Sequence, residues 1–283
     1  MPMARTVALT LLALVAFAGN SLLCRMALAQ TGIDPASFTA VRLLSGALTL
    51  WALVAARGVR AAAGGNWLSA LALFAYAAGF SFSYVSLTAA AGALILFGAV
   101  QVTMIGRGLW AGERLRPLQS AGLLLACGGL VGLLLPGLSA PPLAGALLML
   151  GAGIAWGVYS LRGKAAVDPL QVTAGNFGRA ALLSLVLCLL LWGRASWSGP
   201  GLGYAVLSGA LASGLGYVIW YATLPHLKST TAATLQLAVP VLAALGGVVW
   251  LGEPLTVRLL LASLAILGGI ALVLWVGQRS GAS

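Results

Sequence analysis

The sequence predicts an all-α integral membrane protein whose ten transmembrane helices form two inverted five-helix repeats. Three observations support this: an apolar composition, a series of apolar runs, and an internal duplication. Of the 283 residues, 61% are hydrophobic and 7% are charged, and the mean hydropathy is +1.06. A soluble domain usually has about a quarter of its residues charged. This chain has too few charges to cover a surface in water, so we expect its solvent to be lipid.

Ten apolar runs are long enough to cross a bilayer, which takes about 20 residues in a helix. In chain order they cover residues 6–24, 35–56, 66–87, 89–110, 117–135, 141–162, 170–192, 200–223, 230–250 and 255–276. Because only short connections separate these runs, no separate soluble domain is expected.

The two halves of the chain carry nearly the same motif. The segment Leu-Trp-Ala-Gly-Glu-Arg-Leu at 109–115 recurs as Val-Trp-Leu-Gly-Glu-Pro-Leu at 249–255, so that Glu253 follows Glu113 by 140 positions. Shorter echoes keep the same order, as Asp34-Pro35 recurs in Asp168-Pro169. Because five is odd, a second five-span copy enters the membrane in the opposite direction. We therefore expect a first five-helix repeat at 1–138 and a second, inverted repeat at 139–283, an arrangement typical of alternating-access carriers.

The surplus of basic residues, a net charge of +11, indicates how the chain is oriented. With ten spans and the N-terminus inside, ten basic residues fall on the inner side and three on the outer side. The inner set is Arg5, Arg57, Arg60, Arg107, Arg114, Arg116, Arg162, Lys164, Lys228 and Arg279, and the outer set is Arg25, Arg194 and Arg258. Cytoplasmic loops are enriched in Lys and Arg. We expect a multi-pass protein of the bacterial inner (plasma) membrane with both termini cytoplasmic, and no nucleic-acid partner, which would need basic residues clustered on a soluble face.

The N-terminal segment also imitates a secretory signal, with Arg5, an apolar stretch and the small-residue pattern Ala27-Leu28-Ala29. Cleavage there would remove the first span and break the five-plus-five arrangement, so we expect the segment to remain as the first helix. The three cysteines show no metal-ligand spacing and do not suggest a disulfide framework. No metal and no cofactor are expected.

Taken together, the span count, the duplication and the motifs resemble a known family. Gly112-Glu113 and Gly252-Glu253 close the fourth and ninth spans, and Trp156-Gly157 lies in the sixth. This pattern resembles the EamA group of the drug/metabolite transporter superfamily over essentially the whole chain, and is most similar to bacterial inner-membrane amino-acid exporters, particularly the aromatic amino-acid branch. Two departures are Ala18-Gly19, which lacks the tryptophan of the second repeat, and Arg114 in place of proline.

Polar and aromatic side chains within the spans are the candidate substrate-binding residues, because polar groups in lipid are costly and usually face a partner or a water-filled cavity. The candidates are Tyr76, Phe80, Ser83, Tyr84, Gln101, Trp156, Tyr159, Asn176, Tyr217 and Gln236. Neutral donors, acceptors and aromatic faces suit a zwitterion or a flat apolar side chain better than a strongly charged solute. Each aromatic residue could instead anchor an interface or fill the core; the pocket interpretation is favoured for Tyr76, Gln101, Trp156 and Tyr159.

Three further residues within spans have two interpretations each. Arg42 and Arg179 could hold a substrate carboxylate, but they lie only about two turns into their helices. We therefore expect them to bond backbone carbonyls or to reach the membrane interface. Pro240 lies in the ninth span, where proline removes a backbone hydrogen bond and bends a helix. It is a candidate gating residue, with a fixed kink as the alternative.

The four acidic residues, Asp34, Glu113, Asp168 and Glu253, all lie in loops or at span ends. None is placed for proton or sodium coupling at mid-membrane. One histidine and four peripheral acids cannot easily assemble acid–base catalysis, so no enzyme is expected. We expect an inner-membrane carrier that exports amino acids or similar small metabolites by alternating access through a central neutral polar-aromatic cavity. A drug or toxic-compound efflux carrier is the alternative. A membrane-embedded scaffold, the third hypothesis, would need less buried polarity, and the oligomeric state is left open.

Overall fold

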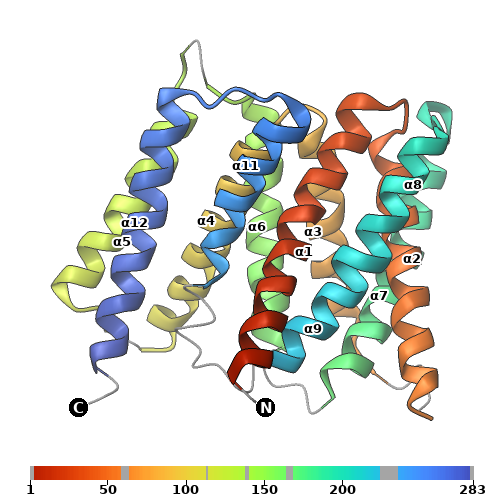
Figure 1. Cartoon of the computed structure of the whole chain (residues 1–283), viewed down its shortest axis with the longest axis horizontal. Helices are drawn as coiled ribbons and strands as arrows, with labels where there is room; N and C mark the ends of the chain where they lie inside the picture. The colour runs from red at the N-terminus through yellow and green to blue at the C-terminus, as the bar shows by residue number, and fades with distance from the viewer. Residues whose placement is uncertain are drawn as a thin grey trace.

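The fold is a bundle of helices that run roughly side by side, as seen in a computed structural model that describes residues 3–58, 64–112, 114–137, 140–163, 168–223 and 235–280 (Figure 1). The helices are α1 (Met3–Gln30), α2 (Pro35–Ala56), α3 (Trp67–Tyr84), α4 (Ala89–Trp110), α5 (Pro117–Leu134), α6 (Leu143–Gly163), α7 (Pro169–Leu190), η2 (Trp192–Arg194), α8 (Gly199–Leu207), η3 (Ser208–Leu215), α9 (Gly216–Thr223), α11 (Ala238–Leu251) and α12 (Val257–Ser280). Both chain ends lie at the lower edge in Figure 1.

The described residues contain nine helices that are long and apolar enough to cross a membrane. One of them joins α8, η3 and α9 into a single rod, Gly199–Thr223. The predicted ninth span, 230–250, corresponds to α11, which has 14 residues and is the shorter apolar helix of the set. The prediction of an all-α integral membrane protein is confirmed, and the N-terminal segment forms α1 within the bundle.

The Asp-Pro echo of the two halves marks two helix starts. The side chain of Asp34 accepts hydrogen bonds from the backbone N–H groups of Ala36 and Ser37 and caps α2. Asp168 caps α7 in the same way. In both helices proline follows the cap, where its missing N–H costs no hydrogen bond.

The Gly-Glu motifs mark two helix ends. Gly252 follows α11 with φ 64°, a left-handed conformation that favours glycine and terminates a helix. Gly112, after α4, also has a positive φ of 94°. The turn at Gly252 brings the N–H of Glu253 to the carbonyl of Gly247 at 3.0 Å, so the glutamate folds back over the end of α11. Glu113, its counterpart, lies outside the described residues.

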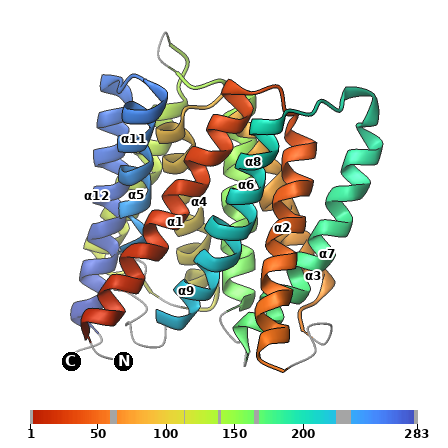
Figure 2. The ribbon, with the colours of Figure 1, turned by 45° about the vertical axis from the view of Figure 1, so that its right-hand side comes forward.

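Helices at corresponding places in the two predicted halves pack against each other: α2 against α7, α4 against α11, and α5 against α12. In the turned view, α5 and α12 form one side of the bundle and α2 and α7 the other (Figure 2). Helix α3 packs against α6, and α1 packs against the rod formed by α8, η3 and α9. A Cβ atom on Gly122 of α5 would lie 2.7 Å from the carbonyl oxygen of Gly269 on α12, so these two backbones approach closely.

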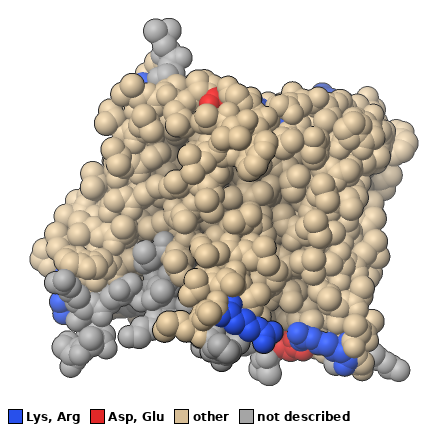
Figure 3. All heavy atoms as spheres, viewed as in Figure 1, with Lys and Arg blue, Asp and Glu red and all other residues tan. Residues whose placement is uncertain are grey.

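On the outer face of the bundle seen in Figure 3, charged side chains lie at the two ends. The figure shows Arg side chains gathered along the lower edge, while the face between the two ends is uncharged. Large apolar side chains such as Leu124, Leu189 and Leu264 are at least 70% exposed on the outside of the helices. An apolar girdle between charged ends is the surface that a bilayer requires.

Replacing Asp34 should destabilise the fold. Beyond its two capping bonds, the Asp34 carboxylate accepts a 3.0 Å hydrogen bond from the N–H of Ser196, which joins the start of α2 to the loop before α8. Burial raises the pKa of this carboxyl, but the hydrogen bonds from Ser37, Ser196 and Ala36 outweigh it and hold the pKa below its ordinary value. The stabilisation is therefore complete at neutral pH and is lost as the pH falls through the folded-state pKa.

We expect Asp34→Ala to lower stability by about 1–2 kcal/mol, measured by thermal unfolding in detergent. Asp168→Ala is the matched control, because among the described residues its carboxylate makes the two capping bonds alone, and its loss should be smaller. Equal losses would contradict the role of the Ser196 bond.

Candidate functional site

A small cavity lies in the middle of the bundle, between helices that are far apart in the sequence. Its volume is about 20 Å³, enough for one water-sized molecule. Its walls come from helices α1, α3, α4, α6, η3 and α9 and from the residues before α11. The lining residues are Phe17, Asn20, Ser21, Tyr76, Phe80, Leu96, Phe97, Trp156, Ala212, Tyr217 and Gln236.

Aromatic rings form much of the cavity wall. The ring centroid of Trp156 lies 4.8 Å from that of Tyr76 and 5.1 Å from that of Tyr217. Phe80 extends the group beyond Tyr76, at 5.4 Å, and Phe17 approaches Tyr217 at 5.9 Å. Such tilted and edge-on pairs stabilise one another and present flat faces to a ligand.

A hydrogen-bonded network runs along one side of this cavity. The Ser208 hydroxyl donates to Asn20 Oδ1 at 2.6 Å, and Asn20 Nδ2 donates to the Tyr76 hydroxyl at 3.3 Å. Arg42 joins at the same oxygen, where its Nη2 donates at 3.1 Å, and its Nε donates to the Ser213 hydroxyl at 3.4 Å. The network therefore connects α1, α2, α3 and η3 across the middle of the bundle.

The residues Ser208–Leu215 have π-helical geometry, a local widening that is common at functional sites. The widened segment carries Ser208 and Ser213 of the network and Ala212 of the cavity wall. It packs against both α1 and α2.

Our expectation for Arg42 is wrong. Its side chain is 1% exposed, and its hydrogen bonds go to two hydroxyl groups, neither to backbone carbonyls nor to the membrane interface. The guanidinium lies 5.2 Å from the ring centroid of Tyr76 and 4.9 Å from that of Phe80. Arg42 lies only about two turns into α2, which suggested a position near the membrane interface. In the structure α1, α3 and η3 cover this part of α2, so the side chain is buried. Arg179 behaves as expected, since its Nη1 donates to the carbonyls of Gly64 and Gly175 at 2.8 and 2.9 Å.

Five of the ten candidate residues line the cavity: Tyr76, Phe80, Trp156, Tyr217 and Gln236. Gln101 lies one helical turn beyond Phe97 on α4 and is buried, and no described residue is a partner for its Nε2. Tyr159 stacks beyond Trp156 at 5.5 Å. These two residues adjoin the lining without being part of it.

The other three candidates lie away from the cavity lining. The hydroxyl of Ser83 donates to the carbonyl of Gly79 within its own helix, and the hydroxyl of Tyr84 donates to the carbonyl of Ala89 at 3.4 Å. Asn176 accepts from the backbone N–H of Asn66 at 2.9 Å. Their contacts hold helix ends and a loop.

Pro240 lies in the first turn of α11, three residues beyond Leu237, where the helix is interrupted. Because proline has no N–H to bond the carbonyl of Gln236, an interruption is expected at this point. The interruption places Gln236 beside the cavity and Pro240 just outside it. Its gating role stays a prediction.

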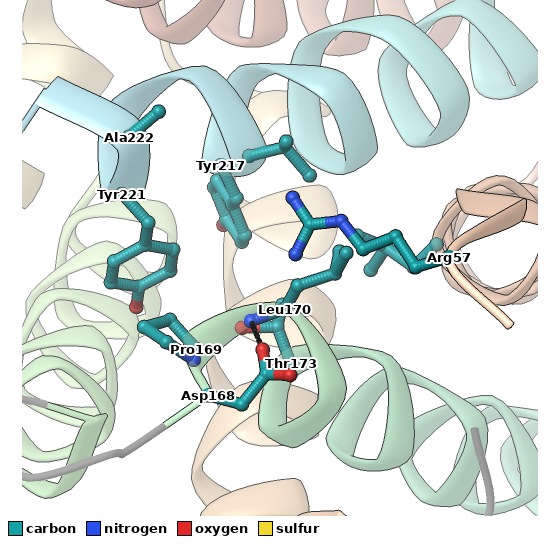
Figure 4. A pocket seen from close by; sticks show the side chains of 10 residues that line it. Arg57, Asp168, Pro169, Leu170, Thr173, Tyr217, Tyr221 and Ala222 are labelled. Carbon is teal, nitrogen blue, oxygen red and sulfur yellow. Dashed lines mark hydrogen bonds between the residues drawn. The ribbon is translucent and has the colours of Figure 1, made fainter. Parts of the chain in front are cut away.

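A second, larger hollow opens toward the lower edge of the bundle. Its volume is about 150 Å³, and Figure 4 shows it between the end of α2, the start of α7, and α9. The Arg57 guanidinium extends into it, with Asp168 and Tyr221 on other sides. We call this hollow the vestibule. Tyr217 lines both the vestibule and the central cavity, so it forms the boundary between them.

The opposite end of the bundle is held together by one ion pair. Arg25 Nε lies 2.8 Å from Glu253 Oε1, and the other Glu253 oxygen accepts from the N–H of Ala89 at 2.7 Å. Arg25 also donates to the carbonyls of Tyr84 and Val85 at 2.9 and 3.2 Å. We call this cluster the upper latch, because it joins the upper ends of α1, α3, α4 and α11.

The sequence alone did not single out several of these residues. Phe17, Leu96 and Ala212 read as ordinary apolar residues of a span, and no local pattern marks them as cavity lining. Glu253 was recognised as part of a repeated motif, but its partner Arg25 lies 228 positions away and no spacing rule relates the two.

A bundle of apolar helices around a polar-aromatic cavity, with a vestibule at one end, defines the class of multi-span membrane transporters. Comparison with known proteins gives the particular family. The EamA-like transporter family matches residues 143–275. An uncharacterized protein of Pseudomonas aeruginosa is 59% identical over 275 residues, which cover 97% of this chain and 96% of that protein. A crystal structure with 22% identity aligns with a TM-score of 0.70 over 98% of this chain and 99% of the other, and so shares the fold.

The chain belongs to the EamA-like transporter family, as the motifs at Gly112 and Gly252 predicted. It is therefore a membrane carrier of small molecules and not an enzyme. The threonine/homoserine exporter RhtA of Escherichia coli (strain K12) is 38% identical over 132 residues, 44% of this chain and 43% of RhtA. The resemblance to amino-acid exporters is thus confirmed, although this relative is named for threonine and homoserine and not for aromatic amino acids.

Substitutions at the cavity should impair transport without unfolding the protein. Trp156→Ala removes the ring between Tyr76 and Tyr217, and Gln101→Ala removes a buried amide beside the lining. We expect both to reduce initial transport rates in proteoliposomes about tenfold or more, a loss of about 1.4 kcal/mol of binding. Trp192→Ala, at a tryptophan that is 66% exposed, is the control and should retain the wild-type rate. Wild-type rates in the first two variants would remove these residues from the site.

Proposed function

We propose that this protein is an alternating-access carrier of the bacterial inner membrane that exports amino acids or similar small metabolites. The observation that carries the proposal is the central cavity, whose polar and aromatic lining comes from both halves of the chain. Buried polarity of this kind is costly in a membrane and is retained where a solute must cross.

The proposed carrier consists of two inverted five-helix repeats, residues 1–138 and 139–283. The packing of α2 with α7, α4 with α11 and α5 with α12 supports this division, because each pair joins corresponding helices. The cavity supports it too: its walls come from the first, third and fourth spans of each half. Substrate sites of inverted-repeat carriers lie at such an interface near mid-membrane.

The proposed resting state faces the cytoplasm. The vestibule opens at the lower edge, where both chain ends lie and where basic side chains gather, and such clusters favour the cytoplasmic side. The upper latch closes the opposite end. Both termini are then cytoplasmic, and a solute enters through the vestibule and past Tyr217.

An amino-acid substrate agrees better with the cavity than the efflux of cationic drugs. Of the described acidic residues, Asp34, Asp168 and Glu253, none lines the central cavity, whereas the guanidinium of Arg42 lies behind two of its rings. A cationic solute would meet a like charge there. The likeness to RhtA, named as a threonine/homoserine exporter, supports the same choice.

Counterflow in proteoliposomes tests the proposed function. Vesicles containing the purified full-length protein are loaded with one unlabelled amino acid and exposed to the same labelled amino acid, beginning with threonine and homoserine, without a pH or sodium gradient. We expect transient accumulation of label for at least one amino acid, because no described carboxylate lies at mid-membrane to require ion coupling. Accumulation of cationic dyes but of no amino acid would favour the efflux alternative, and no accumulation of either would contradict a carrier.

Weakening the upper latch should open the upper end. Glu253→Gln removes the charge that bridges Arg25 and the N-terminus of α4, a loss of about 1–3 kcal/mol for a hydrogen-bonded charge. The neighbouring Cys24 is fully buried and can report the opening in a variant that lacks Cys127 and Cys188. We expect an impermeant maleimide added from the outer side to label Cys24 about tenfold faster.

Arg194→Gln is the control for this experiment, since Arg194 is an exposed arginine in η2 that forms no ion pair among the described residues. Its labelling rate should equal that of the cysteine-reduced parent. The latch would lose its assigned role if Glu253→Gln labelled no faster than this control.

A further inference from the structure

The guanidinium of Arg42 is the most deeply buried charge of the described residues. Its side chain is 1% exposed, and in the described part of the chain the only ion pair is Arg25–Glu253, so Arg42 has no carboxylate partner there. Its Nη1 atom is buried and has no hydrogen-bond partner among the residues that the structure describes. An unpaired buried cation is strongly unfavourable, and a fold retains one only where something else compensates for it.

The described groups around Arg42 accept two of its hydrogen bonds but supply no acceptor for Nη1. The Tyr76 hydroxyl already accepts from Asn20 and from Arg42, so its own proton remains to be donated. The Ser213 hydroxyl accepts from Arg42 Nε. The Nη1 group therefore lacks an acceptor, and the Tyr76 hydroxyl, which accepts from Nη2 of the same guanidinium, has a proton to donate. A carboxylate has two oxygens that accept from a guanidinium and a hydroxyl together.

This donor pair adjoins the central cavity. Tyr76 and Phe80, on which the guanidinium lies, both line the cavity, and Ser213 follows Ala212 of its wall. The cavity holds only a water-sized molecule in this closed arrangement. A substrate carboxylate would thus reach Arg42 when the rings or the π-helical segment of η3 move.

We propose that Arg42, with Tyr76, is the carboxylate-binding group of the central cavity, so that the carrier selects solutes by a free carboxylate. This inference rests on the proposed transport function and names the chemical class of its substrate. It also accounts for a cation that the packing of the fold does not require.

The test compares each transported amino acid with its methyl ester and its carboxamide as competitors of counterflow. Without the carboxylate the charge-assisted hydrogen bonds are lost, and we expect the two derivatives to compete at least about tenfold more weakly with the wild-type protein. Arg42→Gln should bring the free amino acid and its derivatives within about threefold of one another, and Arg42→Lys should restore part of the preference.

Stability separates a binding role from a structural one. Since Arg42 is an unpaired buried charge, Arg42→Gln should leave the melting temperature of the ligand-free protein in detergent unchanged or raise it. Arg179→Gln is the matched control, because Arg179 occupies a transmembrane helix and its bonds go to the backbone carbonyls of Gly64 and Gly175. It should lower the melting temperature and keep the preference for a free carboxylate.

Each outcome decides between the proposals. Equal competition by ester and free amino acid in the wild type overturns the role of Arg42 while leaving a carrier, as does a preference that survives in Arg42→Gln. Absence of counterflow by any amino acid contradicts the proposed function instead. In that case the melting temperatures still test the role of Arg42. If Arg42→Gln lowers the melting temperature as much as Arg179→Gln does, Arg42 is structural and its assignment is overturned.

Discussion

The burial of Arg42 in the centre of an apolar bundle is the constraint on which the rest of the site depends. A guanidinium without a counterion in lipid or in a protein core is costly, and the surroundings compensate for it only in part. The faces of Tyr76 and Phe80 attract the cation, and two hydroxyl groups accept its hydrogen bonds. Helices α1, α2, α3 and η3 all contribute to this arrangement, so the charge is enclosed where four helices meet.

The two ends of the bundle differ in how they are closed. At the upper end, the Glu253 carboxylate accepts from Arg25 and from the first N–H of α4, and so joins the ends of α1, α4 and α11. Arg25 adds the end of α3 through the carbonyls of Tyr84 and Val85. At the lower end a vestibule lies between the end of α2, the start of α7, and α9; Arg57 and Asp168 line it, and neither forms an ion pair with another described residue. In the proposed alternating-access mechanism one end closes while the other opens, and the charge-assisted hydrogen bonds of the upper latch would hold the closed end.

Local sequence signals predicted the elements well where the cause was itself local. The Asp-Pro pairs begin α2 and α7 because a capping carboxylate and a proline act within one helical turn. Gly252 ends α11 because only glycine readily adopts its left-handed conformation. Half of the candidate site also followed from the sequence, since aromatic and polar residues such as Tyr76, Trp156 and Gln236 in an apolar span need a cavity or a partner. For Ser83 and Asn176 a nearby backbone group is the partner instead, and neither residue belongs to the cavity lining.

The sequence by itself determined that the chain is surrounded by lipid, that it is all-helical, which family it belongs to and where most spans end. It could do so because hydrophobicity, capping and glycine geometry act over a few residues. Only the tertiary structure decided which polar side chains meet. Arg42 and Arg179 look alike in the sequence, yet Arg42 is enclosed by three other helices while Arg179 reaches the carbonyl of a neighbouring loop. That difference depends on which elements cover each side chain, and contacts between distant segments set it.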